Sequence, residues 1–277
     1  MSDLVVLQRS DSASSELLAN RLRVPLVENA AHHQGLMLSY VNNRLTLSRP
    51  SSRESGTVCV DFNDAKLNFR LTQSLSREAV VKAVGGCVSH QQASLAPPHL
   101  IDATAGLGQD AFILAAAGWQ VSLVEQSPVV HALLEDGLRR AREAVTVSDI
   151  NQQLSAPIAR QWRMLKQILA RLTLCEPGDS AVVLPSLESA SVIYLDPMFP
   201  GRGKAARVKK NRFLLQQLHG AEATGEGLLP VALKLTAKVV VKRPRLALPL
   251  GGLTPASSLT GKTSRFDIYV GTEEQPD

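Results

Sequence analysis

The sequence predicts an α/β fold with a mostly parallel, Rossmann-like sheet of seven strands that ends in a C-terminal antiparallel hairpin. A small N-terminal α/β module precedes this sheet. Three observations support the prediction. Strand-like apolar runs alternate with helical patterns between residues 100 and 242, which is typical of βαβ units. A glycine-rich turn follows the first of these runs, and the last two runs flank only Gly261 and Lys262.

Length and composition fit one large and one small domain. The chain has 277 residues, enough to bury a sizeable core. We expect the N-terminal module to span residues 1–75, a helix and connector 76–98, and the main domain 99–277. No apolar run approaches the ~20 residues that cross a bilayer, and the N-terminus lacks the basic and apolar segments of a secretory signal. We therefore expect a cytoplasmic protein with no membrane partner.

The charge suits a polyanionic partner without requiring one. Net charge is +5 and the isoelectric point is about 9.3, values that a basic protein without a nucleic-acid partner shares. Three widely spaced cysteines form no CxxC pair and predict reduced thiols: Cys59, Cys87 and Cys175. The six histidines show no metal-ligand spacing, so no metal is implied.

The first 86 residues predict short strands and helices. A strand over Leu4–Leu7 precedes a helix over Ser15–Leu22. Two hairpins follow, in each of which two runs flank a turn: Leu36–Val41 with Arg44–Leu47 about Asn42–Asn43, and Val58–Phe62 with Leu67–Leu71 about Asn63–Asp64. Residues 76–86 predict a helix that ends at Gly85.

Strands and helices alternate after this point. The expected strands are Leu100–Ala103, Gln120–Glu125, Leu172–Cys175, Ser191–Asp196 and Lys238–Lys242. The expected helices are Asp110–Ala117, Pro128–Ala144, Ile158–Ala170 and Leu228–Ala237. A final hairpin joins Ser257–Thr260 to Ser264–Val270. A parallel sheet that ends in such a hairpin suits the seven-stranded methyltransferase architecture better than a dehydrogenase.

The glycine-rich turn predicts a nucleoside cofactor site. Gly106-Leu107-Gly108-Gln109-Asp110-Ala111 fits G-x-G-x-x-A, and glycine allows a sharp turn and a close approach of backbone to ligand. Glu125 ends the next strand, 23 residues after Asp102, where a carboxylate accepts hydrogen bonds from ribose hydroxyls. A lone GxG is as often a purely structural turn, but Glu125 at this position favours a cofactor.

Acidic residues near the turn favour S-adenosyl-L-methionine over NAD. Asp102 lies just before the turn, where we expect it near the methionine ammonium group or near ordered water around that group. Asp110 opens the next helix, where a carboxylate is a poor neighbour for a pyrophosphate but suits a cationic sulfonium ligand. Gly178–Asp179 follows the third strand, and Asp179 is either an acceptor for the adenine amino group or a solvated loop acid.

The segment Asp196-Pro197-Met198-Phe199-Pro200 follows an apolar strand and predicts a site for a base with an exocyclic amine. Such an amine is a poor nucleophile because its lone pair is conjugated to the ring. Asp196 and the Pro197 carbonyl can accept hydrogen bonds from the two N–H groups of the amine. These hydrogen bonds would align the amine with a methyl donor. Phe199 offers a stacking face worth roughly 1–3 kcal/mol per base. We therefore predict Asp196, Pro197 and Phe199 as catalytic residues.

Positive charge beside this motif predicts contact with phosphates, with a solvated basic helix as the alternative. Residues 201–213 contain no acidic residue and six basic ones: Arg202, Lys204, Arg207, Lys209, Lys210 and Arg212. Further basic residues at another strand end and on the small module extend this charge: Lys242, Arg243, Arg245, Arg53, Lys66 and Arg70.

The two motifs together predict methyl transfer from S-adenosyl-L-methionine to an exocyclic nitrogen of a nucleic-acid base. A DNA amino-methyltransferase is the nearest alternative. A non-catalytic RNA-binding or ribosome-assembly factor is an alternative from another class. A NAD dehydrogenase leaves the Asp-Pro-Met-Phe-Pro segment unexplained.

On these motifs the chain resembles the ribosomal RNA small subunit methyltransferase J family. The matching stretches are Asp102-Ala-Thr-Ala-Gly-Leu-Gly-Gln-Asp-Ala-Phe, Pro128-Val-Val-His-Ala-Leu-Leu-Glu-Asp-Gly-Leu, Tyr194-Leu-Asp-Pro-Met-Phe-Pro, Val239-Val-Val-Lys-Arg-Pro and Arg265-Phe-Asp-Ile-Tyr. The resemblance implies methylation of N2 of one guanosine in 16S rRNA, with the rRNA or the 30S subunit as partner.

The resemblance also implies cofactor contacts at Gln109–Asp110, Glu125–Gln126, Gly178–Asp179 and Asp196, beside Asp102, Gly106 and Gly108. This chain departs from the family pattern in carrying Gln109 and Gln126 where other members carry arginine. Before the residue-76 helix it also lacks the family's basic, glycine-rich stretch. Less RNA contact is therefore expected from that segment.

Overall fold

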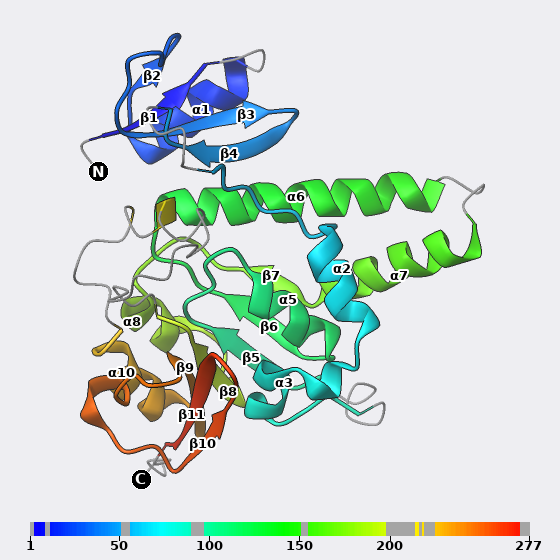
Figure 1. Ribbon diagram of the computed structural model, residues 1–277, viewed down its shortest axis with the longest axis vertical. Coiled ribbons are helices and arrows are strands. Elements are labelled where there is room, and N and C mark those ends of the chain that lie inside the picture. The colour runs from blue at the N-terminus through cyan, green and yellow to red at the C-terminus, as the bar shows by residue number, and fades with distance from the viewer. Residues whose placement is uncertain are drawn as a thin grey trace.

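The computed structural model describes residues 3–8, 12–50, 56–89, 97–150, 155–197, 214–215, 218 and 225–271. The chain forms a large sheet with helices on both faces and a small sheet near the N-terminus (Figure 1). The predicted α/β class, with its seven-stranded sheet and small N-terminal module, is confirmed.

The large sheet has the strand order β10-β11-β9-β8-β5-β6-β7. Its bounds are β5 His99–Asp102, β6 Gln120–Leu123, β7 Leu172–Leu174, β8 Val192–Leu195, β9 Lys238–Pro244, β10 Ser257–Thr260 and β11 Ser264–Val270. The five strands from β5 to β9 are parallel, whereas β11 runs antiparallel to both β9 and β10. The strand order reverses between β5 and β8, and ligands of such sheets bind at the carboxyl ends beside this point.

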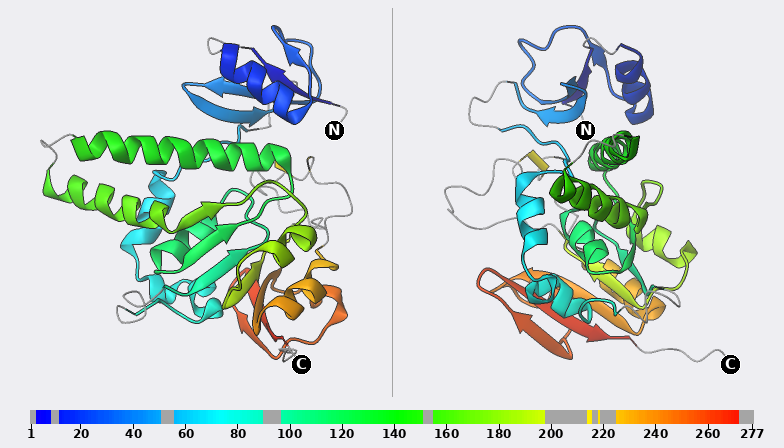
Figure 2. Two further views of the ribbon diagram at one scale, coloured as in Figure 1. Left: turned by 180° about the vertical axis from the view of Figure 1, so that it is seen from behind. Right: turned by 90° about the vertical axis from the view of Figure 1, so that its right-hand side faces the viewer.

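Alternating side chains give the large sheet two apolar faces. Leu100, Tyr194 and Val240 belong to one core cluster, whereas their neighbours Ile101 and Ile193 belong to another. The first face is covered by α3 (Ala79–Val84), α5 (Gln109–Ala116), α6 (Pro128–Ile150) and α7 (Ala156–Ala170). The second is covered by α8 (Ser180–Val183), the 3-10 turn η2 (Leu184–Ser186) and α10 (Leu228–Leu235), which the left view of Figure 2 shows from the side opposite to Figure 1.

The helices expected between the strands are present, and the largest departures from the expected helices are in α6 and in residues 76–86. Helix α6 continues to Ile150 instead of ending near Ala144. Residues 76–86 form a 3-10 turn, η1 (Leu75–Arg77), followed by α3, because Glu78 between them is extended and serves as the N-cap of α3. Within the described ranges, no helix combines the length and apolar character needed to cross a bilayer.

The small sheet has the order β2-β1-β3-β4 and contains β1 Leu4–Leu7, β2 Leu26–Val27, β3 Leu36–Val41 and β4 Arg44–Ser48. Helix α1 (Ser12–Leu22) contacts β1 and β2. The hairpin of β3 and β4 is confirmed, and both turn residues, Asn42 and Asn43, have the positive φ of a type I′ turn. The small sheet packs against α6, where the Asp136 carboxylate accepts a hydrogen bond from the Leu45 amide at 3.1 Å.

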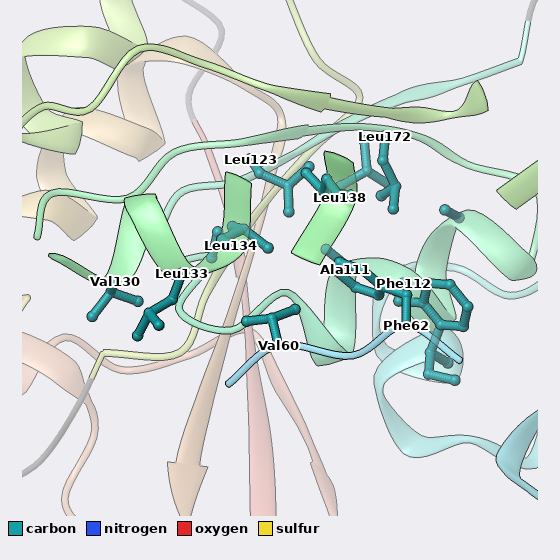
Figure 3. Close-up of a cluster of buried hydrophobic side chains, with 14 of the residues drawn as sticks. Val60, Phe62, Ala111, Phe112, Leu123, Val130, Leu133, Leu134, Leu138 and Leu172 are labelled. Atoms are coloured by element: carbon teal, nitrogen blue, oxygen red, sulfur yellow. The ribbon is translucent and has the colours of Figure 1, made fainter. Parts of the chain in front are cut away.

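The second expected hairpin, about Asn63–Asp64, is wrong. Asp64 instead begins helix α2 (Ala65–Thr72), and its carboxylate accepts a hydrogen bond from the Lys66 amide at 2.6 Å. The preceding segment is extended but makes only an isolated bridge to β4 at Val58. Its alternate side chains enter the core beside α5 and α6, where Phe62 stacks on Phe112 with ring centroids 5.3 Å apart (Figure 3).

Candidate active site

Most residues expected in the site lie at one edge of the large sheet. Parallel register places Asp102 beside Leu123 of β6 and Tyr194 of β8, so the carboxyl ends of these strands meet. The expected residues follow the ends in turn: Gly106, Gly108, Gln109 and Asp110 after β5, Glu125 and Gln126 after β6, Gly178 and Asp179 after β7, and Asp196 and Pro197 after β8. The fold therefore brings the glycine-rich turn and the first two residues of the Asp-Pro-Met-Phe-Pro segment to the same edge.

The two glycines of the turn serve different purposes. Both have positive φ, 54° at Gly106 and 72° at Gly108. A side chain on Gly108 would lie 2.8 Å from Leu134 Cδ1 and 3.1 Å from Phe62 Cζ, so this glycine allows close packing of the core. A side chain on Gly106 would meet only the Thr104 carbonyl, at 3.8 Å. The backbone at Gly106 thus faces open space, where a ligand can approach it closely.

Glu125 is buried and stabilises the same turn. Its Oε2 accepts a hydrogen bond from the Gly106 amide at 2.8 Å, and its Oε1 accepts one from the Ser127 amide at 2.7 Å. Burial raises the pKa of Glu125, and these backbone hydrogen bonds oppose the rise. Each carboxylate oxygen has a second lone pair, so the group can still accept from a ligand hydroxyl.

Asp102 is also buried, at the end of β5. Its Oδ1 accepts a hydrogen bond from the Thr104 amide at 3.1 Å. Burial raises the pKa of Asp102 to about 8; the Thr104 hydrogen bond and Lys242 oppose the rise, whereas Asp110 and Asp196 add to it. A nearby cation would therefore favour the ionised form of this carboxylate.

Asp196 is tied directly to the glycine-rich turn. Its amide donates a hydrogen bond to the Thr104 hydroxyl at 2.6 Å. One residue earlier in the turn, the Ala103 amide donates to the Tyr194 carbonyl at 3.0 Å. The start of the Asp-Pro-Met-Phe-Pro segment is thus held against the predicted cofactor turn by hydrogen bonds on both sides of Leu195.

Lys242 completes the site, although the sequence only suggested a surface cation there. Its Nζ lies 2.6 Å from Asp110 Oδ2 and 2.8 Å from Asp196 Oδ2. Asp110 Oδ2 also accepts a hydrogen bond from the Tyr194 hydroxyl at 2.9 Å. Asp110 thus joins Lys242 and Tyr194 in one hydrogen-bonded group, and its contact with the cofactor stays a prediction.

Opposite charges outweigh burial in this group. Burial opposes the charged form of Lys242, yet Asp110 and Asp196 raise its pKa well above the ordinary lysine value. Burial would likewise raise the pKa of Asp110, but Lys242, Tyr194 and Arg70 together lower it. These three residues therefore keep Asp110 ionised, and Lys242 is shared between two carboxylates.

A strand-register argument could have found this contact. Tyr194 pairs with Val240 across the parallel strands β8 and β9. Asp196 and Lys242 each come two residues later, so they continue along the same face. The missing information was the adjacency of β8 and β9, which no local pattern in the sequence provides.

Two other basic residues that were expected to contact phosphates have internal partners. Arg70 of α2 donates two hydrogen bonds to Glu78, at 3.1 and 3.0 Å, and lies 3.8 Å from Asp110. Arg243 is buried and donates to the Leu248 carbonyl. Lys66 and Arg245 are exposed, and Arg53 lies outside the described residues. The expectation is thus corrected for Arg70, Arg243 and Lys242.

The remaining predicted residues are less engaged or are not described. Gln109 and Gln126 are exposed at the edge. Asp179 caps α8 by accepting a hydrogen bond from the Ala181 amide at 2.9 Å, and the Gly178 amide donates to the Glu125 carbonyl at 3.3 Å. The residues outside the described ranges are Phe199, Arg202, Lys204, Arg207, Lys209, Lys210 and Arg212.

The edge fits a cationic nucleoside cofactor such as S-adenosyl-L-methionine. Burial keeps Asp102 mostly protonated near pH 7, and the other acidic side chains there are Asp110, Glu125, Asp179 and Asp196, against the cations Arg70 and Lys242. This excess of negative charge favours a sulfonium and an ammonium group and disfavours a pyrophosphate. The described ranges contain no cluster of His, Cys, Asp and Glu side chains that could hold a metal ion.

Comparisons with known proteins indicate the same cofactor class. A family model described as a putative SAM-dependent methyltransferase matches residues 18–271. Ribosomal RNA small subunit methyltransferase J from Alteromonas mediterranea is 37% identical over 96% of this chain and 96% of its own length. The protein of the same name from Pseudomonas fluorescens is 40% identical over 93% of this chain and 90% of its own length.

A solved structure is similar over the same extent. The crystal structure of a SAM-dependent methyltransferase from Neisseria gonorrhoeae has a TM-score of 0.66 and 28% sequence identity to this chain. The match covers 96% of this chain and 95% of that structure. At this coverage the match includes most of the small N-terminal sheet and most of the large sheet.

Proposed function

The chain belongs to the ribosomal RNA small subunit methyltransferase J family, and we propose that it methylates the exocyclic N2 amino group of one guanosine in 16S rRNA. S-adenosyl-L-methionine is its cofactor. The observation that carries the proposal is the position of Asp196, whose amide is bonded to the glycine-rich turn and whose carboxylate is bonded to Lys242. The choice of guanine N2 rests on the family resemblance.

Asp196, Pro197 and Phe199 form the acceptor site in this proposal. When bound, the cofactor supplies a methyl group activated by its sulfonium charge. The Asp196 carboxylate and the Pro197 carbonyl accept hydrogen bonds from the two N–H groups of the base and so orient the nitrogen lone pair. Phe199 stacks on the base, which must leave any helix or stack to reach the site.

Other residues of the edge bind and orient the cofactor. Glu125 accepts hydrogen bonds from the ribose hydroxyls, and Asp102 faces the methionine ammonium group. Gly106 allows the backbone to approach the cofactor, and Asp179 is placed to accept from the adenine amino group. Lys242 is a positioning residue, because it fixes the Asp196 carboxylate by a 2.8 Å hydrogen bond without itself being assigned to the base.

Incubation with labelled S-adenosyl-L-methionine tests the proposal. We expect label in 16S rRNA or 30S subunits that lack the modification, and nucleoside analysis should find it as N2-methylguanosine. A competing DNA duplex should not reduce this labelling. Label in the DNA would favour a DNA amino-methyltransferase. If calorimetry detected no binding of S-adenosyl-L-methionine, the chain would instead be a non-catalytic RNA-binding factor.

An Asp196→Ala variant tests the acceptor assignment. Because Asp196 orients the amine, we expect turnover to fall about 100-fold or more, a loss typical of removing one oriented catalytic group. Calorimetry should show that S-adenosyl-L-methionine still binds, since the turn and Glu125 remain. Wild-type turnover in this variant would remove Asp196 from the mechanism.

A further inference from the structure

The loop after β9 presents two leucines to solvent beside the candidate active site. Leu246 is 93% exposed and Leu248 is 81% exposed. Single exposed leucines are ordinary, whereas here two highly exposed leucines lie two residues apart in one short loop. We name residues 245–248 the β9 ledge.

Two arginines beneath the β9 ledge hold its backbone. Arg243 donates from Nε and a terminal nitrogen to the Leu248 carbonyl, at 3.0 and 2.6 Å. Arg265 donates to the carbonyls of Arg245 and Ala247, at 3.1 and 3.0 Å. The fully buried Asp267 in turn accepts hydrogen bonds from Arg265 at 2.7 and 2.8 Å.

Because these hydrogen bonds hold the loop, its two leucines are exposed on an ordered backbone. The loop is also anchored at its far end, where the side chain of Leu250 is buried in the second core cluster. Side chains on a backbone that is already ordered lose less entropy on binding than those on a loose loop. The two leucines of the β9 ledge are thus exposed on a backbone that hydrogen bonds hold in place.

The β9 ledge lies next to the acceptor motif. Strands β8 and β9 are parallel, with Leu195 level with Val241. Asp196 is therefore level with Lys242, and the ledge begins three residues further along the same strand direction. Three residues of extended chain span roughly 10 Å, a separation that the nucleotides beside a base bound at Asp196 can bridge.

The surroundings of the β9 ledge carry positive charge. No acidic residue occurs between Glu226 and Asp267 in the sequence. Arg245 is exposed on the ledge, and its amide donates to the Thr263 carbonyl at 3.3 Å in the turn that carries the exposed Lys262. An apolar pair flanked by two exposed cations complements the bases and phosphates of a nucleic acid.

We propose that the β9 ledge binds the RNA nucleotides that flank the target base, an inference that rests on the proposed function. Leu246 and Leu248 pack against the exposed faces of neighbouring bases, and Arg245 and Lys262 pair with phosphates. When the target base leaves its stack, apolar side chains at the vacated step stabilise the unstacked RNA. The ledge therefore contributes to substrate binding without contacting the reacting atoms.

The test is a Leu246→Ser/Leu248→Ser double variant of the full chain. We expect the Kd and the KM for 16S rRNA or 30S subunits to rise about tenfold, because apolar contact area is lost. The kcat and the Kd for S-adenosyl-L-methionine should stay unchanged. The control is Val270→Ser, an exposed apolar residue that pairs with Lys238 at the opposite edge of the sheet, and it should leave RNA binding unchanged.

Salt dependence provides a second measurement. Arg245→Gln and Lys262→Gln should each reduce the slope of log Kd against log salt by about one, as expected for the loss of one phosphate contact. A slope that matches the wild type in both variants would count against phosphate pairing at the ledge.

Several results would overturn the proposal. Unchanged RNA affinity in the leucine variant does so directly, and a weakened cofactor affinity would make the ledge part of the cofactor site instead. Unchanged RNA binding with the loss of a wild-type dimer would identify a self-association surface. If the wild type binds RNA through the ledge but transfers no methyl group, the ledge stands and the proposed function fails.

Discussion

Lys242 is shared by two carboxylates that come from different segments of the sheet edge. Its Nζ lies within 2.8 Å of both Asp110 and Asp196, and Asp110 also accepts a hydrogen bond from Tyr194. Removing the ammonium group leaves two carboxylates in a partly buried site without their common counter-ion. Breaking such a group costs more than the intact interaction contributes, because the remaining charges stay buried.

A Lys242→Met variant should reduce kcat about tenfold and lower the free energy of unfolding more near pH 8 than near pH 5. In the wild type the pKa of Asp110 is lowered, so its contribution to stability is lost as pH falls. In the variant, which lacks Lys242, burial dominates and raises the pKa of Asp110. The free energy of unfolding of the variant therefore falls as pH rises. Urea unfolding at the two pH values measures the difference.

The matched control is Lys238→Met on the same strand. Lys238 lies at the opposite end of β9, and burial lowers its pKa. Its loss should therefore leave kcat unchanged. Lys242→Arg should restore part of the activity, because the guanidinium can still bind both carboxylates. An equal loss of stability at both pH values in Lys242→Met would contradict the shared-cation role.

Asp102 should make the protein less stable as the pH rises from about 4 to about 8. Its folded pKa is about 8, far above the value of 3.8 for an ordinary aspartate. Between these values the folded state holds a proton that the unfolded state has lost, so stability falls as pH rises, by at most roughly 1.4 kcal/mol per pH unit. Asp102→Asn removes this titration and should raise the melting temperature near pH 8 more than near pH 5. Parallel melting curves for variant and wild type across pH would contradict the assignment.

At the scale of elements, helix α2 shows where local patterns compete. The alternating residues before Asn63 do enter the core alternately, as an extended segment should. The residues after Asp64 were expected to continue this alternation. The side chain of Asp64 binds the Lys66 amide instead, which satisfies a free donor of the first helical turn and starts a helix.

Asp64→Ala should therefore lower the free energy of unfolding by about 1 kcal/mol. The control is Ser155→Ala at the start of α7, where the N-cap side chain makes no capping hydrogen bond. That change should stay within about 0.5 kcal/mol. Urea unfolding of both variants measures the difference, and equal losses would show that the Asp64 cap contributes nothing specific.

At the scale of the whole molecule, α6 joins the small sheet to the large one (Figure 1). Asp136 on this helix is buried and accepts hydrogen bonds from the Leu45 amide, Arg139 and Arg140. Arg140 also donates to the Val60 carbonyl in the segment that leads from the small sheet to α2. One carboxylate thus connects three parts of the chain.

Asp136→Ala should lower the free energy of unfolding by about 3 kcal/mol, because it leaves Arg140 and the Leu45 amide buried without their acceptor. The control is Glu143→Ala, which removes only an exposed pair with Arg139 on the same helix. That change should cost under about 0.5 kcal/mol. A loss in Asp136→Ala no larger than in the control would show that the connection is not important for stability.

The sequence was sufficient for features that depend on near neighbours along the chain. Strand and helix periodicity, the glycine-rich turn and the terminal hairpin are set by steric and burial preferences within a few residues, and the strands of the large sheet were found within two residues of their bounds. The order of the motifs, with the resemblance that they carry, also led to the family.

The tertiary structure was needed wherever a residue's role depends on a distant partner. Lys242 and Asp110 are 132 residues apart in the chain, and only the adjacency of the strands brings them together. Arg70 and Arg243 looked like surface cations for the same reason, since their acceptors are set by the packing of α2 and the loop after β9. The sequence shows that a residue is charged but not where its side chain points. Burial and strand register decide whether that side chain faces solvent or a partner.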